Sequence, residues 1–160
     1  MVIKEVIELR NSSQNLLPKV DFSDTFSTTN HVNSIEEIAF MIFDTSPKWV
    51  EWLFKIRNFL AQFVGLKTAI PEPVSTELAV GGHVNFFEIY RIEDGEIIMG
   101  ANDKHLNFRA VITNYKTEKF NIKVTTLVEY NNRLGRVYMS IIKPFHELVV
   151  KRMVKQAFKK

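Results

Sequence analysis

The chain has 160 residues, of which 46% are hydrophobic and 24% charged, with a net charge of +3 and no cysteine. These values are typical of a soluble protein and fit one domain over residues 1–160, which would bury roughly 70% of its unfolded surface. The absence of cysteine excludes disulfides and thiolate metal sites.

The N-terminus and the hydropathy pattern show no targeting signal. Residues 1–6 interleave charged and apolar side chains, so no signal-peptide core is present. No run of about 18 apolar residues occurs, so no membrane-spanning helix is expected. We therefore expect a cytoplasmic protein.

Positive charge gathers near the C-terminus. Cations favour the negative end of a helix dipole, and the outer face of a helix is normally charged. The pattern therefore favours a solvated helix over a nucleic-acid or membrane surface. We expect no nucleic-acid partner. The six cations, which stand against Glu147 alone, are Lys143, Lys151, Arg152, Lys155, Lys159 and Lys160.

The first predicted strand is Val20–Thr28, after an N-terminal extension (residues 1–20) of irregular pattern. Phe22, Asp24, Phe26 and Thr28 share one side of this strand. Asp24 interrupts the apolar side, which predicts a place at the sheet edge or beside a wet cavity.

Two helices are predicted next. Ser34 and Glu37 form a capping box ahead of a helix whose apolar residues end at Phe43. Pro47 begins the second helix, which ends at Gly65. Its Trp49 and Trp52 fit core packing better than a pocket mouth. Its Arg57 lies on the apolar side and needs an acidic partner or a route to the surface.

The second half of the chain predicts an antiparallel sheet that opens after Gly81-Gly82. Asp94-Gly95 indicates a tight hairpin between its first two strands. The last strand alternates cleanly, which predicts one buried and one wet face. The predicted strands are Phe86–Ile92, Glu96–Gly100, Leu106–Tyr115 and Phe120–Tyr130.

A long C-terminal helix is predicted from about Leu134 to Phe158, with a bend at Pro144. A sheet that ends in such a helix must bury its apolar face against it, and the pairing can hold a cavity. The predicted buried stripe of this helix comprises Leu134, Val137, Tyr138, Ile141, Phe145, Leu148 and Val149.

No nucleophile, phosphate-loop or dinucleotide motif occurs, and the four histidines lack metal-ligand spacing. We therefore expect no metal and no cofactor. The densest polar segment is Gly100–Arg109, in which Asp103, His105 and Arg109 share one side of a strand. Leu106 and its alternating neighbours make the better apolar face, which favours solvent for the polar side. If a helix brings Arg57 or His146 to it, a polar end to an apolar pocket results.

The order of elements resembles the helix-grip fold of the START and birch-pollen-allergen-like superfamily, also called SRPBCC. Three phrases resemble one uncharacterised bacterial family of unknown function within it. They are Ser46-Pro47-Lys48-Trp49-Val50 with Ile56-Arg57-Asn58, Asp103-Lys104-His105-Leu106-Asn107-Phe108-Arg109, and Asn132-Arg133-Leu134-Gly135 leading to Pro144-Phe145-His146. The likeness implies an α+β fold in which a curved antiparallel sheet wraps around the C-terminal helix. It implies no particular activity, because the superfamily includes carriers, receptors and cyclases.

These patterns favour a binding module for a small hydrophobic or amphipathic molecule, held between the sheet and the C-terminal helix. The alternatives are a cyclase- or isomerase-like enzyme with a pocket histidine as acid or base, and a non-catalytic interaction domain with a filled core. The predicted ligand-binding residues are Trp49, Leu53, Arg57, Phe86, Phe108, Val124, Tyr138, Ile141 and Phe145, and the possible polar site comprises Asp103, His105, Arg109 and His146.

Overall fold

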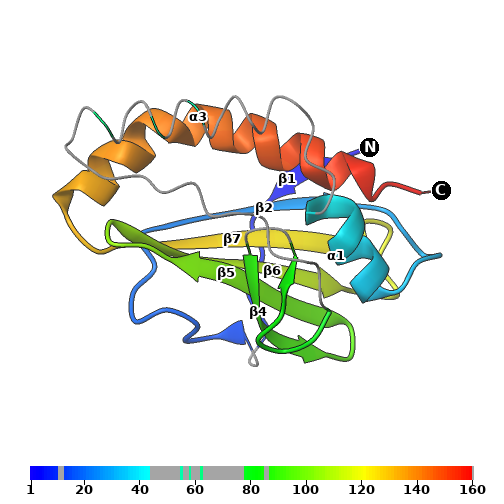
Figure 1. Cartoon of the computed structure of the whole chain (residues 1–160). Helices are drawn as coiled ribbons and strands as arrows, with labels where there is room; N and C mark the ends of the chain where they lie inside the picture. Colours follow the sequence, from blue (N-terminus) through cyan, green and yellow to red (C-terminus); the bar gives the residue numbers. More distant parts are fainter. Residues whose placement is uncertain are drawn as a thin grey trace.

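The computed structural model describes residues 1–10, 13–43, 55, 58, 62, 78–84 and 87–159. It shows an α+β fold in which a seven-stranded antiparallel sheet lies beneath a long C-terminal helix (Figure 1). The strand order is β1-β2-β7-β6-β5-β4-β3. The elements are β1 (Ile3–Glu5), β2 (Phe22–Thr28), α1 (Ile35–Phe43), β3 (His83–Val84), β4 (Phe87–Glu93), β5 (Glu96–Asn102), β6 (Leu106–Asn114), β7 (Ile122–Tyr130) and α3 (Arg133–Gln156).

The predicted hairpins of the sheet are confirmed. β4 and β5 pair across Asp94-Gly95, where Gly95 takes the positive φ of 75° that a tight turn needs. β5 pairs with β6 over seven consecutive residue pairs, and β6 pairs with β7 over nine. A register shift between Ile89 and Arg91 changes the alternation of β4, so that Ile89 before the shift and Ile92 after it both face the helices.

The sheet has two faces, which we call the helix face and the outer face. The helix face carries Phe26, Val124, Ile112 and Ile97 in one cross-strand row, and it packs against α1 and the end of α3. The outer face carries a smaller apolar cluster of Ile98, Val111 and Leu127 with Leu17.

The prediction of a wet face on the last strand is wrong. β7 is buried on both sides from Ile122 to Val128, because the N-terminal segment covers the outer face. Leu9, Leu16 and Leu17 of that segment pack on the outer-face cluster. Polar side chains there are paired: Lys123 lies 2.7 Å from Glu118 and 3.3 Å from Glu5.

β2 does not lie at the edge of the sheet. It pairs with β7 on one side and with β1 on the other. β1 was not predicted from the sequence, because its residues lie in the N-terminal extension of irregular pattern. Asp24 therefore lies inside the sheet, where it is 7% exposed.

The capping box of α1 is confirmed, since Glu37 N donates to Ser34 Oγ at 3.2 Å and Ser34 N donates to the Glu37 carboxylate at 3.0 Å. These two bonds satisfy backbone N–H groups at the helix start that have no partner within the helix. Of the second predicted helix, the structure describes Lys55, Asn58 and Gln62, and each is helical.

The C-terminal helix is confirmed as α3, but the stripe predicted to be buried is wrong. Val137, Ile141 and Leu148 are 58%, 45% and 53% exposed, respectively. The residues that turn towards the sheet are Gly135, Met139, His146, Val150 and Val154. Because Gly135 is small and His146 is polar, the hydrophobicity of the sequence did not mark this face of the helix. It predicted instead that the more apolar neighbouring stripe would be buried. Neither α1 nor α3 combines the length and apolar character that a membrane-spanning helix requires.

Candidate functional site

Asp24 and His146 face each other between the sheet and α3. His146 Nε2 lies 3.3 Å from Asp24 Oδ1, and the side chains are 18% and 2% exposed. Asp24 Oδ2 is buried, and within the described part of the chain it has no hydrogen-bond partner. A buried carboxylate oxygen without a donor is rare and marks this position for closer attention.

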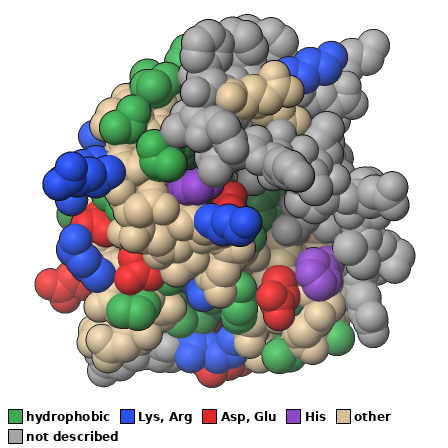
Figure 2. All heavy atoms as spheres, turned by 60° about the vertical axis from the view of Figure 1, so that its left-hand side comes forward, with side chains coloured by type: hydrophobic (Ala, Val, Ile, Leu, Met, Phe, Trp, Pro, Cys, Tyr) green, Lys and Arg blue, Asp and Glu red, His purple; other side chains and the backbone are tan. Residues whose placement is uncertain are grey.

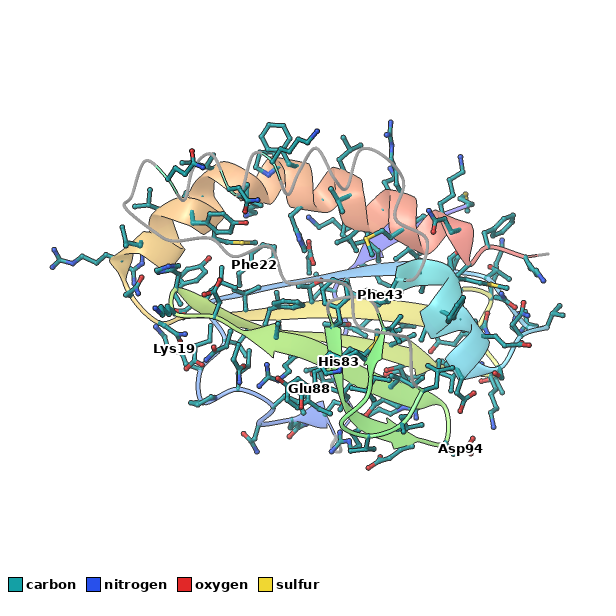
Figure 3. The ribbon with its side chains drawn as sticks, in the orientation of Figure 1. Lys19, Phe22, Phe43, His83, Glu88 and Asp94 are labelled. Atoms are coloured by element: carbon teal, nitrogen blue, oxygen red, sulfur yellow. The ribbon has the colours of Figure 1, made fainter. Side chains whose placement is uncertain are left out.

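Phe22 lies next to this pair, beneath α3 (Figure 3). Its ring meets the His146 imidazole edge to face, with the centroids 5.6 Å apart. Lys143, one helical turn before His146, places its ammonium 5.4 Å from the centre of the Phe22 ring. The cation is exposed and is held by the ring face rather than by Asp24.

Three phenylalanines form an aromatic chain on the helix face. The Phe87 ring lies 5.1 Å from Phe43 and 5.6 Å from Phe108, and both contacts are T-shaped. Phe43 ends α1, whereas Phe87 and Phe108 lie on β4 and β6. Phe87 and Phe108 are only half-buried, although they stand on the face that is turned towards the helices.

A second buried carboxylate, Glu96, lies on the outer face and is fully bonded. Its oxygens accept hydrogen bonds from Ser13 Oγ, from Arg91 Nη2 at 3.3 Å and from Thr113 Oγ1 at 3.2 Å. Its partners come from the N-terminal segment and from two strands, so this network ties the segment to the sheet.

Asp103 and His105 lie at the β5–β6 turn, against the start of α3. The His105 carbonyl accepts a hydrogen bond from Asn131 N at 2.9 Å, and the Asp103 carbonyl accepts one from Asn131 Nδ2 at 2.8 Å. Asn132 caps α3 by accepting from Gly135 N at 3.0 Å. These contacts hold the turn and the helix start together.

Arg109 lies on the outer face. Its guanidinium stacks 4.2 Å from the centre of the Tyr90 ring and donates to Asn102 Oδ1 at 2.9 Å. Burial raises the pKa of the Tyr90 hydroxyl, and the nearby Arg109 charge opposes that rise. The structure thus places Arg109 on the opposite side of the sheet from His146.

The predicted ligand-binding residues fall into three groups. Phe108 and Val124 stand on the helix face, and Val124 is buried there. Ile141 and Phe145 are on the exposed stripe of α3, and Tyr138 is half-buried. Trp49, Leu53, Arg57 and Phe86 lie outside the described residues.

The main residue missing from the predicted site is Asp24. Its signal was visible as a break in the alternation of β2, but nothing in the sequence linked it to His146, which is 122 positions away. Phe22 and Lys143 were not predicted, because an aromatic side chain on a strand and an exposed lysine on a helix are both common.

No single-sign charge patch dominates the face shown in Figure 2, where acidic and basic side chains are interspersed. Among the described residues, no three potential metal ligands gather.

Comparisons with known proteins identify a family without a known activity. No curated protein and no solved structure matches the chain significantly. One family model does match, over residues 16–153, which is most of the sequence. The chain therefore belongs to the family described as "Protein of unknown function (DUF2867)".

Proposed function

We propose that this protein binds a small hydrophobic or amphipathic molecule between the helix face of the sheet and α3. The proposal fits the resemblance of the chain to helix-grip domains, many of which carry ligands in that position. Ligand sites are mostly apolar with a few polar groups, which is the composition of this region.

The observation that best supports this proposal is a change in side-chain exposure along the helix face. The row of Phe26, Val124, Ile112 and Ile97 is closed, with exposures of 2% or less. Two rows further towards the start of α3, Phe22 and Phe108 are half-buried. The accessible part of the face is therefore aromatic, and Asp24 stands between it and the closed part.

Native mass spectrometry of the gently purified protein tests this proposal. We expect a mass above that of the chain, and extraction with organic solvent should release a compound that accounts for it. Phe108→Ser should reduce the occupancy, whereas Val80→Ser, at a position that is 65% exposed, should not. A bare chain mass, together with no thermal stabilisation by apolar probes, would refute binding and leave the interaction-domain alternative.

A second candidate function is supported by the Asp24–His146 pair. If Nε2 donates to Asp24, then Nδ1 is the basic nitrogen, and an oriented imidazole of this kind can act as a general acid or base. This arrangement corresponds to the enzyme alternative of cyclase or isomerase type.

Comparing the compounds bound by the wild type and by His146→Gln separates the two functions. A carrier should release the same compound from both proteins. An enzyme should release product from the wild type and unconverted substrate from the variant.

A further inference from the structure

The two buried carboxylates of the sheet differ in how well they are bonded. The side chains of Asp24 and Glu96 are each 2% exposed. Glu96 has three donors from described residues, including the Arg91 guanidinium. Asp24 faces His146 through Oδ1, while Oδ2 has no partner among the described residues. The chain thus satisfies one buried acid and leaves the other with an open acceptor.

Among the described residues around Asp24, none donates a hydrogen bond to Oδ2. Phe22 flanks it from the same strand face, and Thr126 is its neighbour on β7. The Lys143 ammonium is exposed and lies over the Phe22 ring. Burial without a hydrogen bond penalises a carboxylate, so a donor that arrives with a ligand gains a strong, charge-assisted bond there.

We infer that the ligand carries a hydrogen-bond-donating head group without negative charge, an alcohol or an amine, and that Asp24 Oδ2 accepts its hydrogen. This inference rests on the proposed binding function and specifies the ligand class. The tail then lies along the accessible aromatic part of the helix face, near Phe108. Because Oδ2 is closed to solvent, the side chains that cover it must move to admit the head group.

The same geometry selects against anionic head groups. A carboxylate or phosphate placed at Oδ2 would meet a like charge in a site shielded from water, where repulsion is strong. The Nε2 of His146 already faces the other oxygen, Asp24 Oδ1. Lys143 is too exposed to compensate a second buried anion.

The test uses three ligands with one tail and different heads: 1-decanol, decylamine and decanoate, each below its micelle concentration. Dissociation constants are measured by calorimetry for the wild type, Asp24→Asn and Glu96→Gln. The last variant is a matched control, because it neutralises a buried acid on the opposite face of the sheet. Circular dichroism checks the fold of each protein.

We expect the wild type to bind decanol or decylamine at least about tenfold more tightly than decanoate, which is a modest difference in binding free energy. Asp24→Asn should reduce that ratio to near one, while Glu96→Gln should preserve it. A preference for decylamine over decanol assigns a cationic head, and the reverse assigns a neutral one.

The wild-type ratio alone can overturn the inference, without any variant. Equal or tighter binding of decanoate contradicts the donor head group but leaves the binding function intact. A ratio that Asp24→Asn does not change also contradicts it. Failure of all three ligands to bind contradicts the proposed function itself.

Discussion

Single residues link α3 to the sheet through a polar contact as well as through apolar packing. Asp24 on β2 faces His146 in the middle of α3. Lys4 on β1 places its Nζ 2.6 Å from Glu147 Oε1 on α3. The Lys4–Glu147 pair is exposed and contributes little to stability. In the Asp24–His146 pair the carboxylate is buried and the imidazole half-buried, so removal of one partner has larger consequences.

His146→Leu should destabilise the protein by about 2 kcal/mol, because it removes the partner that faces a buried carboxylate. Asp24→Leu/His146→Leu should be more stable than His146→Leu alone, since no buried charge remains. Equilibrium urea unfolding measures both. Additive effects of the two substitutions would show that the pair does not interact.

Gly135→Ala should destabilise the protein, although the same change in an exposed helix normally stabilises by up to about 1 kcal/mol. A Cβ at this position would lie 2.0 Å from the His105 carbonyl oxygen. The turn and the helix start must then separate, at a cost of about 1–3 kcal/mol. Thermal unfolding measures the change, with Ser140→Ala as an exposed control in the same helix. A raised melting temperature for Gly135→Ala would contradict the close contact.

The contribution of Asp21 to stability should depend on pH. A hydrogen bond from Lys19 and one from the backbone N–H of Tyr130 lower the pKa of Asp21 below its ordinary value of 3.8. Its stabilising effect is therefore present above that value and is lost as the pH falls through the lower, folded pKa. Asp21→Asn should be less stable than the wild type at pH 7, and the two should converge in acid.

Urea midpoints measured from pH 7 down to about pH 2 follow that convergence. Asp94→Asn is the control, since the Asp94 side chain is 93% exposed. A stability difference between the wild type and Asp21→Asn that stays constant over this range would contradict the assignment.

At the scale of elements, the sequence predicted β2, the four strands β4 to β7, α1 and α3, because their signals are local. Asp94-Gly95, the Ser34 capping box and the alternation of β6 each need only neighbouring residues. The outer face was mispredicted because its cover comes from Leu9 to Leu17, whose packing partners are about a hundred positions away. Such contacts leave no local pattern.

The site was harder to predict than the fold for the same reason. Asp103, His105 and Arg109 are dense in sequence, yet the structure divides them between a turn and the outer face. Asp24 and His146 form a pair only because β2 and α3 meet in space. His146 was proposed as a possible polar residue, but its partner could not be identified from spacing.

The N-terminal segment should contribute substantially to stability. Leu17 is 5% exposed and packs on Ile98, Val111 and Leu127. Leu17→Ala should cost about 2–4 kcal/mol through lost burial and the cavity left behind. Val20→Ala, at a position that is 49% exposed, should change stability by about 0.5 kcal/mol or less. Similar urea midpoints for the two variants would show that the segment does not cover the outer face.

At the scale of the whole molecule, the two faces of the sheet have different roles. The N-terminal segment and the Glu96 network close the outer face. The helix face is closed beneath α1 but partly accessible beside Phe87 and Phe108. A ligand should therefore perturb one face of the sheet and leave the other unchanged.

Methyl NMR during a titration with decylamine tests this central claim directly. Met99 and Ile89 on the helix face, with Met139 on α3, should shift progressively, whereas Ile98 on the outer face should not. All four side chains are buried, so exposure does not bias the comparison. Shifts confined to Ile98, or equal shifts on both faces, would contradict a binding site between the sheet and α3.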